Sequence, residues 1–311
     1  MRMSNSGDHR AGNAQSGKYV TFLRLWVGDP NPGGQLSTST AFRCRSWCRY
    51  ATALLVMGAI LRPNVLPAQQ VKVAHKEGLV HGFLVLRTPE GKFLADGDLI
   101  QNVQGDRVIS RLVFHFTDGS LHEETTVFSQ RGQFRLLSDH FIQKGPAFEH
   151  PMDLRINATT GEVVARYVED GKEKYLTEHL NLRPDIANGL LLTLLKNIRP
   201  DTRETNLSFV VAIPKPQLVK LHITPKGEES FTTGEAPRKA MHYVVKIDIG
   251  GLKGIFASLV GKEPPDIGVW ILEGEAPAFV RFEGPLAPGA PVWRIDLVSP
   301  VFPRSSAVRT K

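Results

Sequence analysis

The chain has 311 residues, of which 41% are hydrophobic, so it can bury a substantial core, and global disorder is excluded. Its formal net charge is +7, but the excess lies in residues 1–68, which hold 8 Lys/Arg and 2 Asp/Glu, against 30 and 29 in residues 69–311. A nucleic-acid-binding surface needs excess positive charge on the folded part of a protein, so we expect no nucleic-acid partner. Both cysteines, Cys44 and Cys48, also precede residue 69, which excludes thiol chemistry from the rest of the chain.

The N-terminal segment has the pattern of an export signal. Arg43, Arg45 and Arg49 precede the apolar run ATALLVMGAIL, which an Arg-Pro pair ends. Eleven residues are too few to span about 30 Å of hydrocarbon but suit the apolar region of a signal peptide. We therefore expect residues 43–68 to be a signal peptide, with export of a chain starting near Gln69 to the periplasm or the cell exterior. The alternative is that the apolar run is a core helix.

Residues 1–42 are rich in Gly, Ser, Asn, Pro and Thr and show no sustained hydrophobic period. This composition predicts a disordered extension, or a translation start assigned too far upstream. No Pro/Gly/Ser-rich linker interrupts residues 69–303, so we expect a single β-rich domain there, followed by a disordered tail at 304–311. The mature chain is expected to have no membrane span.

The first part of this domain alternates short β-prone runs with turn signals, such as Asp118-Gly119, which is the pattern of an antiparallel meander. Eight strands are predicted in hairpin order, at Leu79–Arg87, Phe93–Val103, Val108–Thr117, Leu121–Ser129, Phe134–Gln143, Met152–Ile156, Val163–Val168 and Lys174–Leu182. The pattern resumes after a break. Six further strands are predicted at Leu207–Ile213, Leu218–Thr224, Met241–Ile249, Ile267–Leu272, Ala278–Phe282 and Val292–Val298.

In the segment between the two sets of strands, apolar residues recur at the spacing of a helix. The apolar stripe that shows it consists of Ala187, Leu190, Leu191, Leu194, Leu195 and Ile198. Pro200 ends the run, so we expect a buried helix over residues 187–198, lying across the apolar face of the sheet. Gly250–Val260 is a second candidate helix. The predicted fold class is mainly β: a large, curved antiparallel meander or half-barrel sheet covered by one or two helices.

Three segments carry a resemblance to known proteins: INATTGEVVARYVEDGKEKY at 156–175, PDIANGLLLTLLKNI at 184–198 and MHYVVKIDIGGLKGIFASLVGKEPPDIGVWIL at 241–272. The chain resembles uncharacterised exported bacterial proteins whose architecture is similar to the LolA-like half-barrels of periplasmic lipoprotein carriers. The resemblance covers about residues 75–303. It implies a strongly curved sheet, partly closed by helices around a hydrophobic hollow, and it assigns no site residue.

Standard catalytic motifs are absent from the sequence. It contains no G-x-S-x-G, no H-E-x-x-H, no phosphate-binding loop and no paired-cysteine zinc pattern. Gly250-Gly251-x-x-Gly254 has the wrong spacing for a dinucleotide-binding loop. We therefore expect no cofactor and favour a non-enzymatic function.

One candidate metal site lies at the hairpin around Asp118-Gly119. If these two residues form the whole loop, His115 lies opposite His122, and Glu124 follows on the same face. Two imidazoles and a carboxylate can hold a metal with an open position. The other interpretation is a solvated outer face of the sheet.

A candidate ligand site follows from the next hairpin. Its predicted register places Glu123 opposite His140, on a face shared with large apolar side chains. The group can be a hydrogen-bonded structural network or a few polar groups that orient a ligand in an apolar hollow. The candidate ligand-binding residues are Phe114, Phe116, Glu123, Leu136 and His140.

These observations favour an exported protein that binds or carries a lipid or other apolar molecule on a curved sheet. A second hypothesis is an interaction or assembly module of the cell envelope that recruits a protein partner through exposed strand edges. A metal-dependent hydrolase is the third, and the missing motifs disfavour it.

Overall fold

The computed structural model describes residues 70–169, 171–212, 215–233, 236–250, 264–286 and 290–298. They all belong to one compact unit, Val65–Lys311. The N-terminal extension, the signal peptide and the C-terminal tail expected from the sequence lie outside the described residues. So does the second candidate helix, apart from Gly250.

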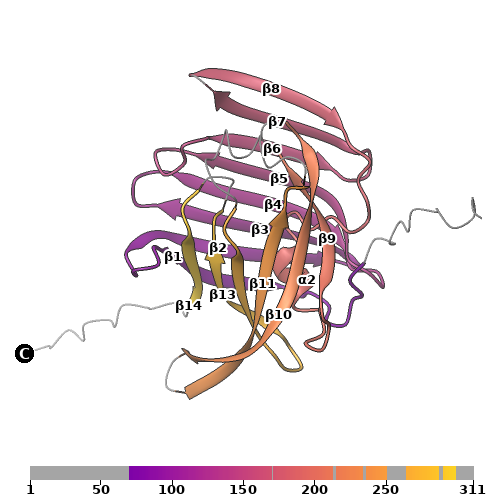
Figure 1. Ribbon diagram of the computed structural model, residues 1–311, viewed down its shortest axis with the longest axis vertical. Coiled ribbons are helices and arrows are strands. Elements are labelled where there is room, and N and C mark those ends of the chain that lie inside the picture. The colour runs from indigo at the N-terminus through magenta and orange to yellow at the C-terminus, as the bar shows by residue number, and fades with distance from the viewer. Residues whose placement is uncertain are drawn as a thin grey trace, which may run out of the picture. The chain divides into compact units, whose positions relative to one another are not determined.

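The described strands form one antiparallel sheet, and each meander predicted from the sequence is present (Figure 1). The first meander consists of β1 (Val80–Arg87), β2 (Phe93–Gln104), β3 (Arg107–Phe116), β4 (Leu121–Ser129), β5 (Arg135–Lys144), β6 (Met152–Asn157), β7 (Glu162–Glu169) and β8 (Lys172–His179). The second consists of β9 (Thr205–Val211), β10 (Gln217–Thr233), β11 (Ala236–Asp248), β12 (Ile267–Leu272), β13 (Ala278–Gly284) and β14 (Trp293–Val298).

A single pairing joins the two meanders. β1 lies antiparallel to β14, with Leu86 opposite Ile295, so the strand order is β8-β7-β6-β5-β4-β3-β2-β1-β14-β13-β12-β11-β10-β9. The strands at the two ends of this order, β8 and β9, do not pair with each other within the described residues. The sheet is therefore not closed into a barrel, and the fold class expected from the sequence is confirmed.

The apolar stripe after the first meander is buried, but the helix that carries it is short. The helix α2 covers only Leu191–Leu195. The chain on either side makes tighter three-residue turns, in which the amide of Leu190 donates to Ala187 and that of Ile198 donates to Leu195. In the described part of the chain, no helix is long and apolar enough to cross a membrane.

The segment before α2 is attached to the edge strand β9. Ile186 forms a parallel bridge with Ser208, whose amide donates to the carbonyl of Asp185 at 3.1 Å. The side-chain amide of Asn188 then makes two hydrogen bonds with the backbone of Val210, at 2.7 and 2.9 Å. The Asn188 side chain thus makes the backbone hydrogen bonds that a neighbouring strand would make, and together with the bridge at Ile186 it covers this edge of β9.

The stripe is expected to contribute strongly to stability. Leu190 is 1% exposed, whereas Leu79, before the first strand, is 81% exposed. Leu190→Ala should lower the free energy of unfolding by about 2–5 kcal/mol, because it removes buried methyl groups and leaves a void. Leu79→Ala, the matched control, should change it by less than about 0.5 kcal/mol. Urea unfolding followed by circular dichroism measures both, and equal effects of the two variants would contradict the packing described here.

Candidate functional site

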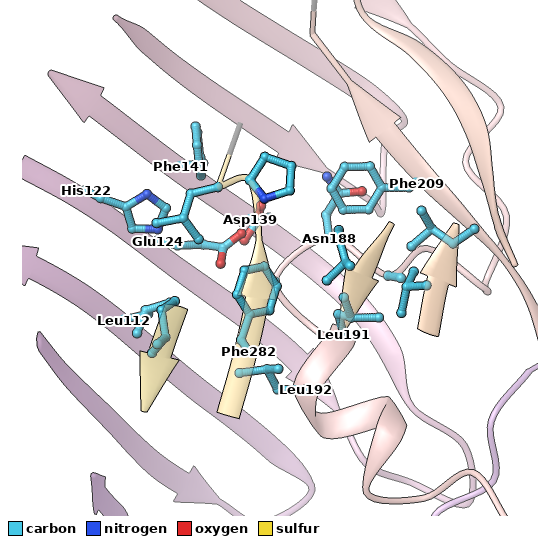
Figure 2. A pocket seen from close by; sticks show the side chains of 18 of the residues that line it. Leu112, His122, Glu124, Asp139, Phe141, Asn188, Leu191, Leu192, Phe209 and Phe282 are labelled. Carbon is cyan, nitrogen blue, oxygen red and sulfur yellow. The ribbon is translucent and has the colours of Figure 1, made fainter. Parts of the chain in front are cut away.

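A cavity of about 490 Å³ lies between the two meanders, beside α2 (Figure 2). Both meanders contribute to it, and α2 and the turn before it complete the wall. Most of its surface is made of Leu, Phe, Val and Ile side chains. Among the larger ones are Leu112, Phe141, Leu192, Phe209, Phe279 and Phe282.

The first meander presents its side chains to the cavity in rows that run across the strands. One row is polar throughout, since Gln101 lies opposite Ser110, Ser110 opposite Thr126, and Thr126 opposite Asp139. All four side chains are buried. Because residues in register on an antiparallel sheet share a face, this row forms a polar track across β2 to β5.

The next row is apolar except for one carboxyl group. Leu99 lies opposite Leu112, which lies opposite Glu124, and Glu124 lies opposite Phe141. Glu124 is therefore a diagonal neighbour of Asp139 on the same face. Figure 2 shows the two carboxyl groups close together in the cavity.

Asp139 is held in place by its neighbours. Its Oδ1 accepts a hydrogen bond of 2.8 Å from the hydroxyl of Thr126, and its side chain is 3% exposed. Gly189, in the turn before α2, packs directly on this pair with a φ of 62°. A Cβ atom there would collide with both side chains, so this close approach requires glycine. Burial raises the pKa of Asp139 to about 7, although the Thr126 hydroxyl opposes the shift.

Glu124 is half-buried, and it lines the cavity. Within the described residues it makes no hydrogen bond or ion pair. Burial raises its pKa well above the usual value, and the negative charge of Asp139 raises it further. Both carboxyl groups thus keep their protons to a higher pH than free carboxyl groups do.

His122 is also in the cavity wall, and it is uncharged. Burial lowers its pKa to about 4. Its Nδ1 accepts a hydrogen bond of 3.0 Å from the amide of Gln143, so the proton of the neutral ring is on Nε2. The rings of Phe141 and His122 pack edge to face with their centroids 5.2 Å apart. This contact holds the imidazole at the border between the polar and apolar parts of the cavity.

The one lysine among the described lining residues is already paired. The ammonium of Lys196, just after α2, lies 2.5 Å from a carboxylate oxygen of Glu77. Both side chains are largely buried, and the backbone of Glu77 is anchored by two hydrogen bonds to the side chain of Gln130. This ion pair neutralises the lysine, and no other Lys or Arg is among the described residues that line the cavity.

The three candidate metal ligands are not brought together. His122 and Glu124 face the cavity, whereas His115 is exposed on the opposite face of the sheet. The reason is the loop, since the amide of Phe116 bonds to the carbonyl of Ser120 and His115 lies opposite Leu121. The loop thus has three residues rather than two, and the predicted register was wrong by one residue. Within the described residues no three His, Cys, Asp or Glu side chains are placed to hold a metal.

The five candidate ligand residues do not line the cavity. Phe114, Phe116 and Leu136 are buried in the core around it. Glu123 is on the outer face, where it pairs with Arg111 at 2.7 Å, and His140 bonds to Asp153 at 2.9 Å on that same face. The one-residue shift at the first hairpin moves Glu123 outward and turns Glu124 inward.

Asp139 was not among the site residues expected from the sequence. A strand side chain two residues from Phe141 and four from Gln143 shares their face, but the face itself follows only from the correct register. A β-bulge between Val127 and Phe128 changes that register again between β4 and β5. No local signal in the sequence marks this bulge.

The raised pKa of Asp139 predicts a pH-dependent stability. Its folded-state pKa exceeds the unfolded value, so its contribution to stability is present below about pH 4 and is lost as the pH rises through about 7. Asp139→Asn keeps an acceptor for Thr126 but cannot ionise. The variant should therefore gain stability relative to wild type by about 2–4 kcal/mol between pH 4 and pH 8. Chemical denaturation of both proteins across this range measures the difference, and a constant offset would show that Asp139 does not titrate as described.

Comparisons with known proteins add only a general likeness. No protein-family model matches the sequence, and no curated protein matches it. Among solved structures, one that is similar is a crystal structure described as a beta-barrel-like protein of domain of unknown function DUF1849 from Brucella abortus. The match has a TM-score of 0.41 and 10% sequence identity, and it covers 74% of this chain and 100% of that chain. A likeness at this level carries no argument about ligand, partner or activity.

Proposed function

We propose that the protein is an exported, non-enzymatic binding protein that holds or carries a lipid or other apolar small molecule. The observation that supports this most directly is the cavity of about 490 Å³ between the two meanders. Protein interiors are close-packed, and voids left by packing are far smaller. The cavity also falls in the range of about 300–1,000 Å³ that is usual for small-molecule sites.

The composition of the cavity wall supports an apolar ligand with one polar end. Apolar side chains, among them Leu, Phe, Val and Ile, cover most of the wall, and the ionisable groups Glu124 and Asp139 are grouped in one part of it (Figure 2). Small-molecule sites commonly combine an apolar surface with a few polar groups that orient the ligand. A wall of this kind fits an amphiphile better than a sugar or a nucleotide.

The alternative of an interaction module finds less support. β8 is an open edge, since within the described strands it pairs only with β7. Its sequence, KEKYLTEH, is rich in Lys and Glu, and charged side chains on an edge strand discourage the addition of a further strand. The other edge, β9, is covered by the segment before α2. We therefore favour the binding function.

The proposal is tested with the full-length chain expressed in a bacterium and recovered from the periplasm without detergent. Native mass spectrometry should show an added mass, and organic extraction should release it as an apolar molecule. The exported product should begin near Gln69, which N-terminal sequencing checks. An apo mass that takes up no hydrophobic probe would overturn the binding function, and an intact N-terminal segment on the exported product would overturn the signal-peptide assignment.

Filling the cavity should block binding. Leu192 lines the cavity, whereas Leu297, on β14, is exposed outside it. Leu192→Trp should weaken binding of the neutral dye Nile red by at least about tenfold, since the added rings occupy the space that the ligand needs. Leu297→Trp is the matched control and should bind the dye as wild type does. A fluorescence titration compares the three proteins, and equal affinities would place the binding site elsewhere.

A further inference from the structure

We propose that the ligand is an amphiphile whose polar end is a primary amine in its ammonium form, held between Glu124 and Asp139. Its apolar chain would lie against the leucine and phenylalanine side chains of the cavity. This inference rests on the proposed binding function and names the chemical class of its ligand.

The charges around the cavity favour a cation. Among the described residues that line it, four are ionisable: His122, Glu124, Asp139 and Lys196. Lys196 is neutralised by Glu77, and His122 is a neutral ring fixed by Gln143. Among the described ionisable side chains of the cavity wall, the two carboxyl groups are therefore the only ones whose charge on ionisation is not balanced by a partner. Ionisation of either buried group without a counter-charge is costly, and a cationic ligand would remove that cost.

The hydrogen-bonding groups point to the same class. Of the four carboxyl oxygens, only Oδ1 of Asp139 accepts a hydrogen bond within the described residues, from Thr126. The other three have no donor there, and an ammonium group offers three N–H donors. Charge-assisted hydrogen bonds of this kind are about twice as strong as neutral ones.

The site is built rather than incidental. Asp139 and Glu124 lie on adjacent strands in the interior of the sheet, and Asp139 is almost fully buried. Gly189 closes over Asp139 and Thr126 and leaves no space for a side chain of its own. Asp139 thus has a fixed position before a ligand arrives, which lowers the entropic cost of binding.

Other polar ends fit less well. A fatty acid or a phosphate brings a negative charge, which would oppose the ionisation of the two carboxyl groups instead of compensating it. An alcohol would bring one donor for three open acceptors. The observations therefore favour an amine over an acid, a phosphate or an alcohol.

Binding of an ammonium group should release protons. Burial raises the pKa of both carboxyl groups and so favours their protonated form, whereas an adjacent cation favours their ionised form. An alkylamine stays protonated up to about pH 10. The affinity should therefore rise as the pH increases through about 7. Lys196 stays paired with Glu77, and His122, with its pKa near 4, stays neutral over this range.

The test uses three probes with the same chain length: decylamine, decanol and decanoate. Isothermal titration calorimetry with the protein from the full-length gene, at pH 8, should give a decylamine affinity at least about tenfold above that of decanol, with decanoate weakest. At pH 5.5 the preference for decylamine should shrink. Titrations in buffers of different ionisation enthalpy should show proton release with decylamine and none with decanol.

Variants assign the preference to the two carboxyl groups. Glu124→Gln and Asp139→Asn keep the shape of each side chain and should bring the decylamine-to-decanol ratio close to one. Glu123→Gln is the matched control on the outer face of the same strand, and it should keep the wild-type ratio. Thermal unfolding checks that each variant is folded.

The outcomes separate this inference from the proposed function. If decanol and decylamine bind equally, or if Glu124→Gln and Asp139→Asn both retain the preference, the amine inference is overturned and the binding function stands. If none of the three probes binds, both are overturned. A decylamine preference that disappears in Glu124→Gln and Asp139→Asn but persists in Glu123→Gln supports both.

Discussion

The two hydrogen bonds between the Asn188 side chain and the Val210 backbone are the contact on which the cavity depends. The Asn188 amide donates to the carbonyl of Val210 and accepts from its N–H, as a neighbouring strand would. The next residue, Gly189, packs on Thr126 and Asp139 in the first meander. Two consecutive residues therefore connect the edge of one meander to the interior face of the other. The position of α2, and with it one wall of the cavity, follows from this connection.

The cavity combines features that oppose each other energetically. Large side chains such as Phe114 and Phe128 are fully buried around it and supply much of the core. Glu124 and Asp139, in contrast, are partly or fully withdrawn from water with no counter-charge among the described residues, and their raised pKa values reflect that cost. A core designed for stability alone would fill the space with apolar groups. Retention of a void and of two carboxyl groups at one place is typical of sites where function sets the side chains.

The strands were predictable because their signals are local. β-prone runs between turn residues place β4 at Leu121–Ser129 and β12 at Ile267–Leu272, with the bounds expected from the sequence. The length of α2 was not predictable from its apolar stripe. The stripe indicates which residues are buried, and a short helix with a turn on either side buries the same residues as a long helix would. The hairpin register was not predictable from Asp118-Gly119 alone. Such a pair also fits a three-residue loop with Gly119 at a φ of 84°.

The site was less predictable than the fold, because a register error of one residue moves every side chain of a strand to the opposite face of the sheet. His122 and Glu124 were recognised as a pair on one face, and that pairing holds. The predicted register put His115 on the same face as His122 and Glu124. That face would then be the outer one, so the prediction did not place His122 and Glu124 in a cavity. Asp139 becomes visible as a partner only when β5 is aligned with β4 across the bulge at Val127 and Phe128.

The pairing of β1 with β14 also bears on how the chain folds. Every other strand pair in the sheet joins neighbours in the sequence, so each can form as a hairpin soon after its two strands are available. The pairing of Leu86 with Ile295 instead closes a loop that contains nearly all of the described chain. Since the entropic cost of loop closure grows with loop length, this pairing has the largest loop-closure cost of the strand pairs in the described sheet. Because both meanders line the cavity, its formation depends on the strand pair whose members are farthest apart in the sequence.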